Sequence, residues 1–256
     1  MQKTGVYEWA DESVNIQIGC ENGCRYCYAR HRAVERFGYC KSNEAWLKPV
    51  VDRKKVNKQY RKNFGTVMFP STHDITPSNV HDYLQVATKL LEAGNNLLIV
   101  SKPDFECIKK LCFELSCFDK SRILFRFTIG SLSDEVLRFW EPNTPSPSER
   151  VKCLKYAFAK GYRTSVSCEP YLDAFPCITY GSCLPFLTDS FWIGKLRGWH
   201  RILLDDCVDE PAKKYLAQFK ENLSDEFVKA MYQILNGRPL VKWKDSIREV
   251  VETQLK

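Results

Sequence analysis

The chain has 256 residues, is 44% hydrophobic and 27% charged, and carries a formal net charge of +7, so it can bury a sizeable core without disulfides. No apolar run approaches the roughly 18 residues of a membrane span, and the N-terminus lacks the pattern of a signal peptide. We therefore expect a cytoplasmic protein with no membrane partner, whose 12 cysteines are reduced and indicate metal binding or catalysis where they cluster.

The apolar pattern predicts alternating strands and helices. Period-two alternation predicts a first strand over residues 14–18, and residues 29–37 have the pattern of a helix. Residues 40–62 are polar, aromatic and basic, as in an insertion. Further strands are expected at 66–69, 97–100, 123–129, 164–168 and 191–196, with helices at 79–93, 104–115 and 147–161 between them.

The order of these elements predicts an α/β fold. No hairpin signal separates the strands, so we expect a parallel sheet with right-handed crossovers. Six βα units are too few to close an eight-stranded barrel, which favours a partial parallel (β/α)6 barrel over residues 1–200. Residues 201–256 are expected to form a C-terminal helical extension packed on the same domain, with helices at 210–221, 224–235 and 244–255.

A cysteine motif follows the first predicted strand. Cys20, Cys24 and Cys27 have the spacing C-x3-C-x2-C. Three thiolates this close can bind three irons of a [4Fe-4S] cluster and leave the fourth iron open to another molecule. The alternatives are unligated thiols, or a zinc site completed by Cys40 or His31, although structural zinc sites usually combine two C-x2-C knuckles and the sequence has no second one.

The chain resembles the radical S-adenosylmethionine (SAM) superfamily in this spacing, in Tyr26 before the last cysteine, and in the βα repetition that follows. Residues 123–129, 141–146 and 149–150 resemble its spore photoproduct lyase-like branch, and the likeness covers residues 13–196. The resemblance implies that SAM bound at the cluster is reductively cleaved to methionine and a 5′-deoxyadenosyl radical, which abstracts hydrogen from a substrate.

The resemblance also implies roles for residues at the strand ends. In that branch a Lys and a Ser hold the SAM carboxylate, and these roles fall on Lys102 and Thr128, while Tyr26 would flank the adenine. Other expected SAM-binding residues are Ser71, Thr72, Asp74, Ser131 and Glu169. Spore photoproduct lyase has a hydrogen-donating Cys where this chain has Ser71. A hydroxyl is a much poorer hydrogen-atom donor, which weakens the case for thymine-dimer reversal.

Two residues are candidates for catalysis. His73, beside Asp74 at a strand end, could position the SAM amino group or act as an acid and base, or could be an ordinary loop histidine. Cys168, after the fifth strand, could donate a hydrogen atom, and Glu169 could pair with SAM or with Arg126.

The remaining cysteines admit a second cluster or simple packing. Cys168 could join Cys177 and Cys183 in an auxiliary cluster completed by Cys207 or Cys153, with ordinary packing thiols as the alternative. Residues 107, 112 and 117 are five apart, point to different helix faces, and are expected to be packing thiols.

Residues 25–62 form a basic segment, with twelve Lys and Arg against three Asp and Glu. Aromatic residues are interleaved with these cations, as in surfaces that stack bases and follow a phosphate backbone: Tyr26, Tyr28, Phe37, Tyr39, Trp46 and Tyr60. We expect the substrate to be a nucleic acid base or lesion; a peptide or small metabolite is the alternative. The segment could instead receive an acidic electron donor such as flavodoxin or ferredoxin, or the protein could be a non-catalytic, metal-braced nucleic-acid-binding module.

Overall fold

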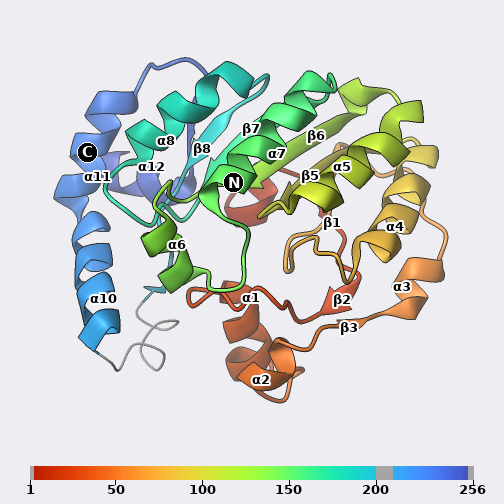
Figure 1. The fold of residues 1–256 in the computed structure, drawn as a ribbon, viewed down its shortest axis with the longest axis horizontal. Coiled ribbons are helices and arrows are strands. Elements are labelled where there is room, and N and C mark those ends of the chain that lie inside the picture. The colour runs from red at the N-terminus through yellow and green to blue at the C-terminus, as the bar shows by residue number, and fades with distance from the viewer. Residues whose placement is uncertain (1–2, 200–209, 253–256) are drawn as a thin grey trace.

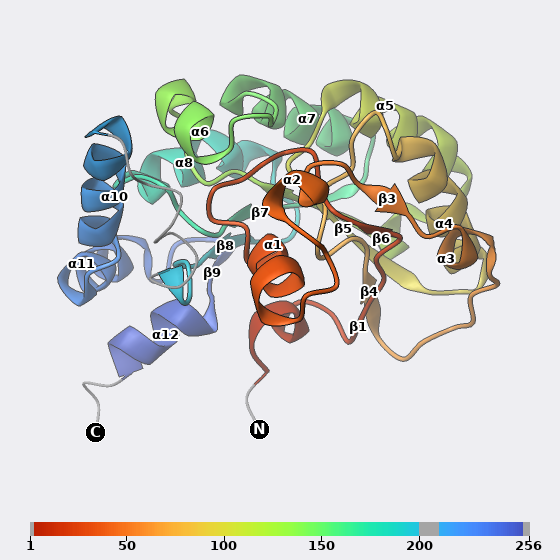
Figure 2. The ribbon, with the colours of Figure 1, turned by 90° about the horizontal axis from the view of Figure 1, so that it is seen from below.

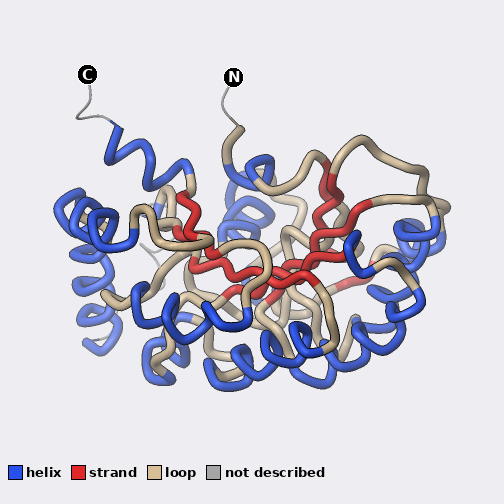
Figure 3. The backbone as a smooth tube through the Cα atoms, turned by 90° about the horizontal axis from the view of Figure 1, so that it is seen from above, coloured by secondary structure: helices blue, strands red, loops and turns tan. Residues whose placement is uncertain are grey.

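A computed structural model describes residues 3–199 and 210–252. Within these residues one sheet has seven strands in the order β1-β4-β5-β6-β7-β8-β9, and every neighbouring pair is parallel. The sheet curls into a half-barrel with helices along its outer side (Figure 3). The strands are β1 (Glu12–Ser13), β4 (Thr66–Met68), β5 (Asn96–Ser101), β6 (Ile123–Thr128), β7 (Arg163–Cys168), β8 (Phe191–Ile193) and β9 (Val241–Trp243). The predicted partial parallel barrel is therefore confirmed, with seven strands in place of six.

Amphipathic helices cover the outer face of the sheet (Figure 1). They include α4 (Val80–Glu92), α5 (Phe105–Glu114), α6 (Asp134–Trp140), α7 (Pro147–Ala159) and α8 (Pro176–Cys183). The helix α7 begins with a side-chain cap, because Ser146 accepts a hydrogen bond from the Glu149 amide and Pro147 occupies the first turn. The core between sheet and helices includes Phe125 and Phe127 of β6, both fully buried. Cys107 and Cys112 pack into this core as expected, whereas Cys117 is exposed.

The first predicted strand is wrong in its position. The barrel begins with Glu12–Ser13, and β2 (Gln17–Ile18) instead pairs antiparallel with β3 (Val50–Val51) outside the main sheet. The buried side-chain amide of Gln17 donates a hydrogen bond to the Gly19 carbonyl and accepts one from the Asn79 side chain. These bonds hold β2 in its position outside the main sheet. The period-two alternation of apolar residues correctly indicates an extended segment. The strand that pairs with this segment is β3, which belongs to the predicted insertion over residues 40–62.

The basic segment contains several short helices, and the first two of them follow one another directly where a helix over residues 29–37 is predicted. They are α1 (Tyr28–His31), the π-helical turn η2 (Arg32–Arg36), α2 (Asn43–Trp46) and α3 (Arg53–Asn57). α1 and α2 project from one end of the half-barrel (Figures 1 and 2). The segment is thus attached to the barrel next to the cysteine motif and through the β2–β3 pair.

The C-terminal region contains the expected helices α10 (Glu210–Asn222), α11 (Asp225–Leu235) and α12 (Asp245–Glu252). It also contains β9, which the sequence pattern does not predict and which adds the seventh strand beside β8. The 3-10 helix η1 (Gly5–Glu8) meets this region from the other end of the chain, where the Lys244 ammonium donates to the Gly5 carbonyl over 2.7 Å. No helix among the described residues is long and apolar enough to cross a membrane.

Candidate functional site

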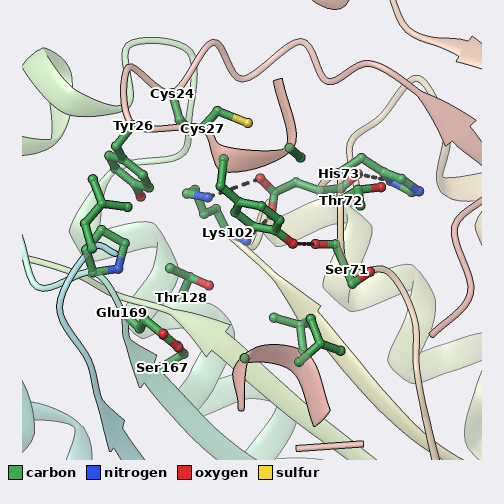
Figure 4. Close-up of a pocket in the computed structure, with 18 of the residues that line it drawn as sticks. Cys24, Tyr26, Cys27, Ser71, Thr72, His73, Lys102, Thr128, Ser167 and Glu169 are labelled. Carbon is green, nitrogen blue, oxygen red and sulfur yellow. Dashed lines mark hydrogen bonds and ion pairs between the residues drawn. The ribbon is translucent and has the colours of Figure 1, made fainter. Parts of the chain in front are cut away.

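A cavity of about 440 Å³ opens at the carboxyl ends of the barrel strands. Its wall combines the cysteine loop, the ends of β4 to β8, and the segments around η1 and β9. In the view of Figure 4, Cys24, Tyr26 and Cys27 lie on one side of the cavity, and Thr128, Ser167 and Glu169 lie on the other. This is the edge where parallel barrels collect functional groups.

The cysteine loop brings all three motif cysteines to this cavity. Cys20 and Cys24 are 6% and 7% exposed, and Cys27 is half-buried. The Cys27 sulfur caps α1 by accepting a hydrogen bond from the Arg30 amide over 3.3 Å. The Cys20 amide donates to the Trp46 carbonyl over 2.9 Å. The loop is therefore fixed at both ends.

The donor set of the cysteine loop consists of three thiols, the ligands that iron–sulfur clusters use. Among the described residues, no three His, Cys, Asp or Glu side chains converge closely enough to hold one metal ion. In a cluster each thiolate binds a different iron, so the three sulfurs surround a larger volume. Burial raises the pKa of Cys20 to about 12 and also raises the pKa of Cys24 and Cys27. The thiols are thus neutral without a metal and would lose protons on binding one.

Asp74 ties the cysteine loop to the sheet. Its carboxylate accepts hydrogen bonds from the Asn22 side chain at 2.8 Å and from the Lys102 amide at 2.7 Å. The Lys102 ammonium lies 3.5 Å from the same group. Burial alone would raise the pKa of Asp74, but Lys102 and these hydrogen bonds lower it, so the carboxylate is ionised.

A buried polar network holds Tyr26. Its hydroxyl donates to Glu141, and Glu141 forms an ion pair with Arg150 in which neither side chain has exposed surface. Arg150 also donates to the Thr128 carbonyl at 3.1 Å. In the sequence, Glu141 and Arg150 are noted only for their resemblance to the family. In the structure, their ion pair and the hydrogen bond to Tyr26 hold this part of the site in place. Asn143 does the same, because its side chain donates to the Glu21 carbonyl at 3.0 Å.

The loop after β4 lines the cavity with Ser71, Thr72 and His73. Asn15 orders this loop, since its side-chain oxygen accepts from the amides of Ser71 and Thr72 at 2.8 and 2.9 Å. His73 is 7% exposed, and its Nε2 has no hydrogen-bond partner among the described residues. Burial lowers the pKa of His73 to about 4, so the ring is neutral at physiological pH.

The predicted residue Glu169 lines the cavity beside Lys244, which the sequence pattern does not reveal as a site residue. Both line the cavity, and the Lys244 ammonium lies 3.6 Å from Glu169 and 2.6 Å from Glu8. Burial raises the pKa of Glu169 to about 7 in spite of Lys244. Glu169 therefore pairs with Lys244, whereas Arg126 pairs with Asp189 at 3.6 Å. Lys244 could be found from the sequence only by recognising β9, a three-residue strand.

Two predicted site residues lie away from the cavity. Ser131 is fully buried, donates to Asp173, and is not among the described residues that line the cavity. Cys168 is also fully buried, and its thiol points to the Gly130 carbonyl at 3.9 Å. Because side chains alternate along a strand, the neighbouring Ser167 faces the cavity instead. Within the described residues Cys168, which is predicted to supply a hydrogen atom to the site, therefore does not line this cavity.

The other cysteines are dispersed. Cys177 is exposed, whereas Cys183, Cys153 and Cys168 are buried in the core, and no three of the described His, Cys, Asp and Glu side chains form a group that could hold a metal ion. Cys207 lies outside the described residues. Cys40 is buried beside Cys20, but its thiol donates to the Ser42 carbonyl at 3.6 Å.

The aromatic residues of the basic segment divide into two groups. Tyr26 and Trp46 are buried, while Tyr28, Phe37 and Tyr39 are between 41% and 55% exposed; Tyr28 lines the cavity together with the two buried rings. The guanidinium groups of Arg32 and Arg36 lie 5.5 and 5.2 Å from the centre of the Phe37 ring. Tyr60 is half-buried, with its hydroxyl donating to the Lys55 carbonyl.

No family model matches the sequence, and no curated protein matches it significantly. Solved structures do match. A variant of spore photoproduct lyase with bound AdoMet (SAM) and dinucleoside spore photoproduct superposes with a TM-score of 0.56 at 15% identity, covering 94% of this chain and 78% of that one. Spore photoproduct lyase complexed with the dinucleoside photoproduct gives 0.55 at 15% identity and the same coverage.

A weaker likeness, to Streptococcus suis SuiB bound to precursor peptide SuiA, has a TM-score of 0.49 at 12% identity over 74% of this chain and 40% of SuiB. The resemblance to the spore photoproduct lyase-like branch is confirmed at the level of the fold. The half-barrel of this chain shares the fold of spore photoproduct lyase.

Proposed function

We propose that this protein is a radical SAM enzyme that holds a [4Fe-4S] cluster on Cys20, Cys24 and Cys27. The observation that carries the proposal is the meeting of these three thiols with Lys102, Asp74 and Thr128 in one cavity, at the carboxyl edge of the half-barrel. The fold shared with spore photoproduct lyase, which has been observed with bound AdoMet, supports it. When bound and reduced, the cluster would supply the electron that cleaves SAM to a 5′-deoxyadenosyl radical.

The residues of the chain have separate tasks in this proposal. Lys102 offers its ammonium to the carboxylate of SAM, because Lys102 lines the cavity and its ammonium is only loosely paired with Asp74, at 3.5 Å. Tyr26 is fixed through its hydroxyl and presents its ring to the cavity as a surface for the adenine. Glu169 and Thr128 offer oxygens to the amino or ribose groups from the opposite wall. Ser71, Thr72 and His73 complete the polar rim.

The fixed geometry serves to position SAM and to exclude water. Asn22 and Asn143 attach the cysteine loop to the sheet and to the segment after α6 (Figure 4 shows the cavity that results). Gly23 within the loop has a φ of +62°, and a Cβ there would lie 3.2 Å from the Asn143 side chain. A reactive radical needs this kind of enclosed, ordered site to avoid side reactions.

We propose a nucleic acid base or lesion as the substrate. Arg32 lines the cavity, and Phe37 and Tyr39 are more than half exposed next to it along the basic segment. Exposed rings beside guanidinium groups suit stacked bases and their phosphates. The same basic surface suits an acidic electron donor such as flavodoxin or ferredoxin, which would compete with nucleic acid for it.

Anaerobic reconstitution with iron and sulfide tests the proposed chemistry. With dithionite and SAM, we expect 5′-deoxyadenosine and iron-dependent visible absorbance from the native chain and from Cys117→Ala, whose cysteine is exposed and outside the cavity. Cys24→Ala should give neither. Zinc without iron in the purified protein, or a fully loaded cluster that cleaves no SAM, would refute the proposal.

Binding of a single-stranded oligonucleotide tests the substrate class. We expect the logarithm of the binding constant to fall with the logarithm of salt concentration, by about 0.7 per phosphate contact. Arg36→Ala should make the slope shallower by about that amount, since Arg36 is exposed, and Lys214→Ala on α10 should leave it unchanged. Binding that is insensitive to salt and to Arg36 would favour a peptide or a small metabolite.

A further inference from the structure

A second cavity of about 330 Å³ lies at the opposite, amino-terminal end of the half-barrel. Its wall includes the first residues of three strands, Thr66 of β4, Asn96 of β5 and Arg163 of β7. Trp9 lines both this cavity and the one with the cysteines. A small apolar cluster divides the two, because its Met68 borders the first cavity and its Leu98 borders the second.

Among the described residues, four cations line this second cavity: Arg122, Arg126, Arg163 and Lys242. The two acids in the same lining are already engaged. Asp189 lies 2.5 Å from Arg163 and 3.6 Å from Arg126, and Glu8 lies 2.6 Å from both Lys244 and Arg248, which are outside the lining. The wall therefore has an excess of positive charge that its own carboxylates do not neutralise.

Arg126 is the most informative residue of this wall, because it is 4% exposed and only partly hydrogen-bonded. Its Nε donates to Ser165 at 2.9 Å and its Nη2 to Ser190 at 3.3 Å, but its Nη1 has no partner among the described residues. An unsatisfied buried guanidinium nitrogen is expensive in a folded protein. Burial lowers the pKa of Arg126 to about 10 in spite of Asp189, which agrees with an incompletely compensated charge.

Besides the Nη1 of Arg126, two further N–H donors belong to residues of this wall. The indole nitrogens of Trp9 and Trp192 are buried and lack partners within the described part of the chain. The guanidinium of Arg126 lies 4.7 Å from the Trp9 ring centre and 5.5 Å from that of Trp192. The rings therefore hold the guanidinium in place, and three buried N–H groups of residues that line this cavity have no acceptor among residues 3–199 and 210–252.

We infer that this cavity binds a small phosphorylated molecule, with its phosphate on Arg126. Guanidinium and indole N–H groups donate to phosphate oxygens, and several cations favour a dianion over a singly charged carboxylate. Arg163 and Lys242 are the exposed cations of the described lining, and they would attract the anion from solution. The volume is within the range of small-molecule sites and exceeds that of a lone phosphate. The site is independent of the proposed SAM chemistry.

Calorimetric titration with inorganic phosphate at constant ionic strength tests this inference on the full chain. We expect saturable binding that weakens at least about tenfold in Arg126→Met, which removes a charged hydrogen-bond donor. Lys242→Ala should weaken it about threefold, as expected for an exposed charge. Lys214→Ala makes the same change of charge on α10, outside both cavities, and should bind like the native chain.

If Arg126→Met does not fold, the inference is tested by comparing the phosphate affinity of Lys242→Ala with that of Lys214→Ala, since both positions are exposed. Absence of saturable binding would overturn the inference, as would equal weakening by both lysine variants. Binding that is lost in Lys102→Ala but kept in Lys242→Ala would place the phosphate in the cysteine-lined cavity and also overturn it.

Discussion

Removal of either partner of the Glu141–Arg150 ion pair should strongly destabilise the fold. Both side chains are fully buried, and the pair connects Tyr26 of the cysteine loop to α7. A buried charge left without its partner costs about 3–5 kcal/mol, so Glu141→Gln and Arg150→Met should each lower the free energy of unfolding by roughly that amount. Tyr26→Phe removes one hydrogen bond to the charged Glu141 carboxylate and should lower it by about 1.5–3 kcal/mol.

Urea unfolding followed by circular dichroism measures these changes. The double variant Glu141→Leu/Arg150→Met leaves no lone charge, so its loss should be at least about 2 kcal/mol smaller than the sum of the single losses. Lys109→Ala breaks an exposed ion pair with Glu106 and should change stability by less than about 1 kcal/mol. Single losses below about 1 kcal/mol, or fully additive losses in the double variant, would refute the argument.

Three further predictions concern burial around the site. The pKa of His73 is about 4 in the fold against an ordinary value of 6.5, so on acidification the unfolded chain is protonated before the folded one. The free energy of unfolding should therefore fall by about 3 kcal/mol as the pH drops from 6.5 to 4. Urea unfolding at several pH values measures this fall, which should be smaller in His73→Asn. Gly194→Ala should cost about 1–3 kcal/mol in the same assay, because its Cβ would lie 2.8 Å from the Lys244 side chain. Iodoacetamide on the native protein should label exposed Cys177 and spare buried Cys168, as peptide mass spectrometry would show; rapid labelling of Cys168 would contradict its position.

Most of the fold could be predicted because most of its elements carry strong local signals. α7 has a capping serine, a proline in its first turn and apolar residues at helical spacing, and β5 is a run of apolar residues. β1 and β9 have two and three residues and no such signal. Their pairing depends on the rest of the sheet, so tertiary context rather than local pattern determines them.

The site could be predicted well where chemistry is concentrated in the chain and poorly where it depends on orientation. Cys20, Cys24 and Cys27 are close in sequence and meet in one cavity, and Lys102 follows a strand whose end points there. Cys168 ends a strand that the apolar pattern also predicts, yet it faces the core. A shift of one residue in a strand moves a side chain from one face of the sheet to the other, and the sequence pattern around Cys168 does not determine on which face its side chain lies.

The two ends of the described chain close the open side of the half-barrel, and this closure shapes both cavities. A seven-stranded sheet leaves a gap between β1 and β9, where backbone groups would otherwise be unpaired and water would reach the interior. Lys244, just after β9, binds Glu8 and the Gly5 carbonyl of η1, and it also faces Glu169 on the cavity wall. Trp9, next to Glu8, then forms a wall of each cavity. The contacts that connect the two edges of the half-barrel therefore form one wall of the cysteine-lined cavity and one wall of the inferred phosphate site.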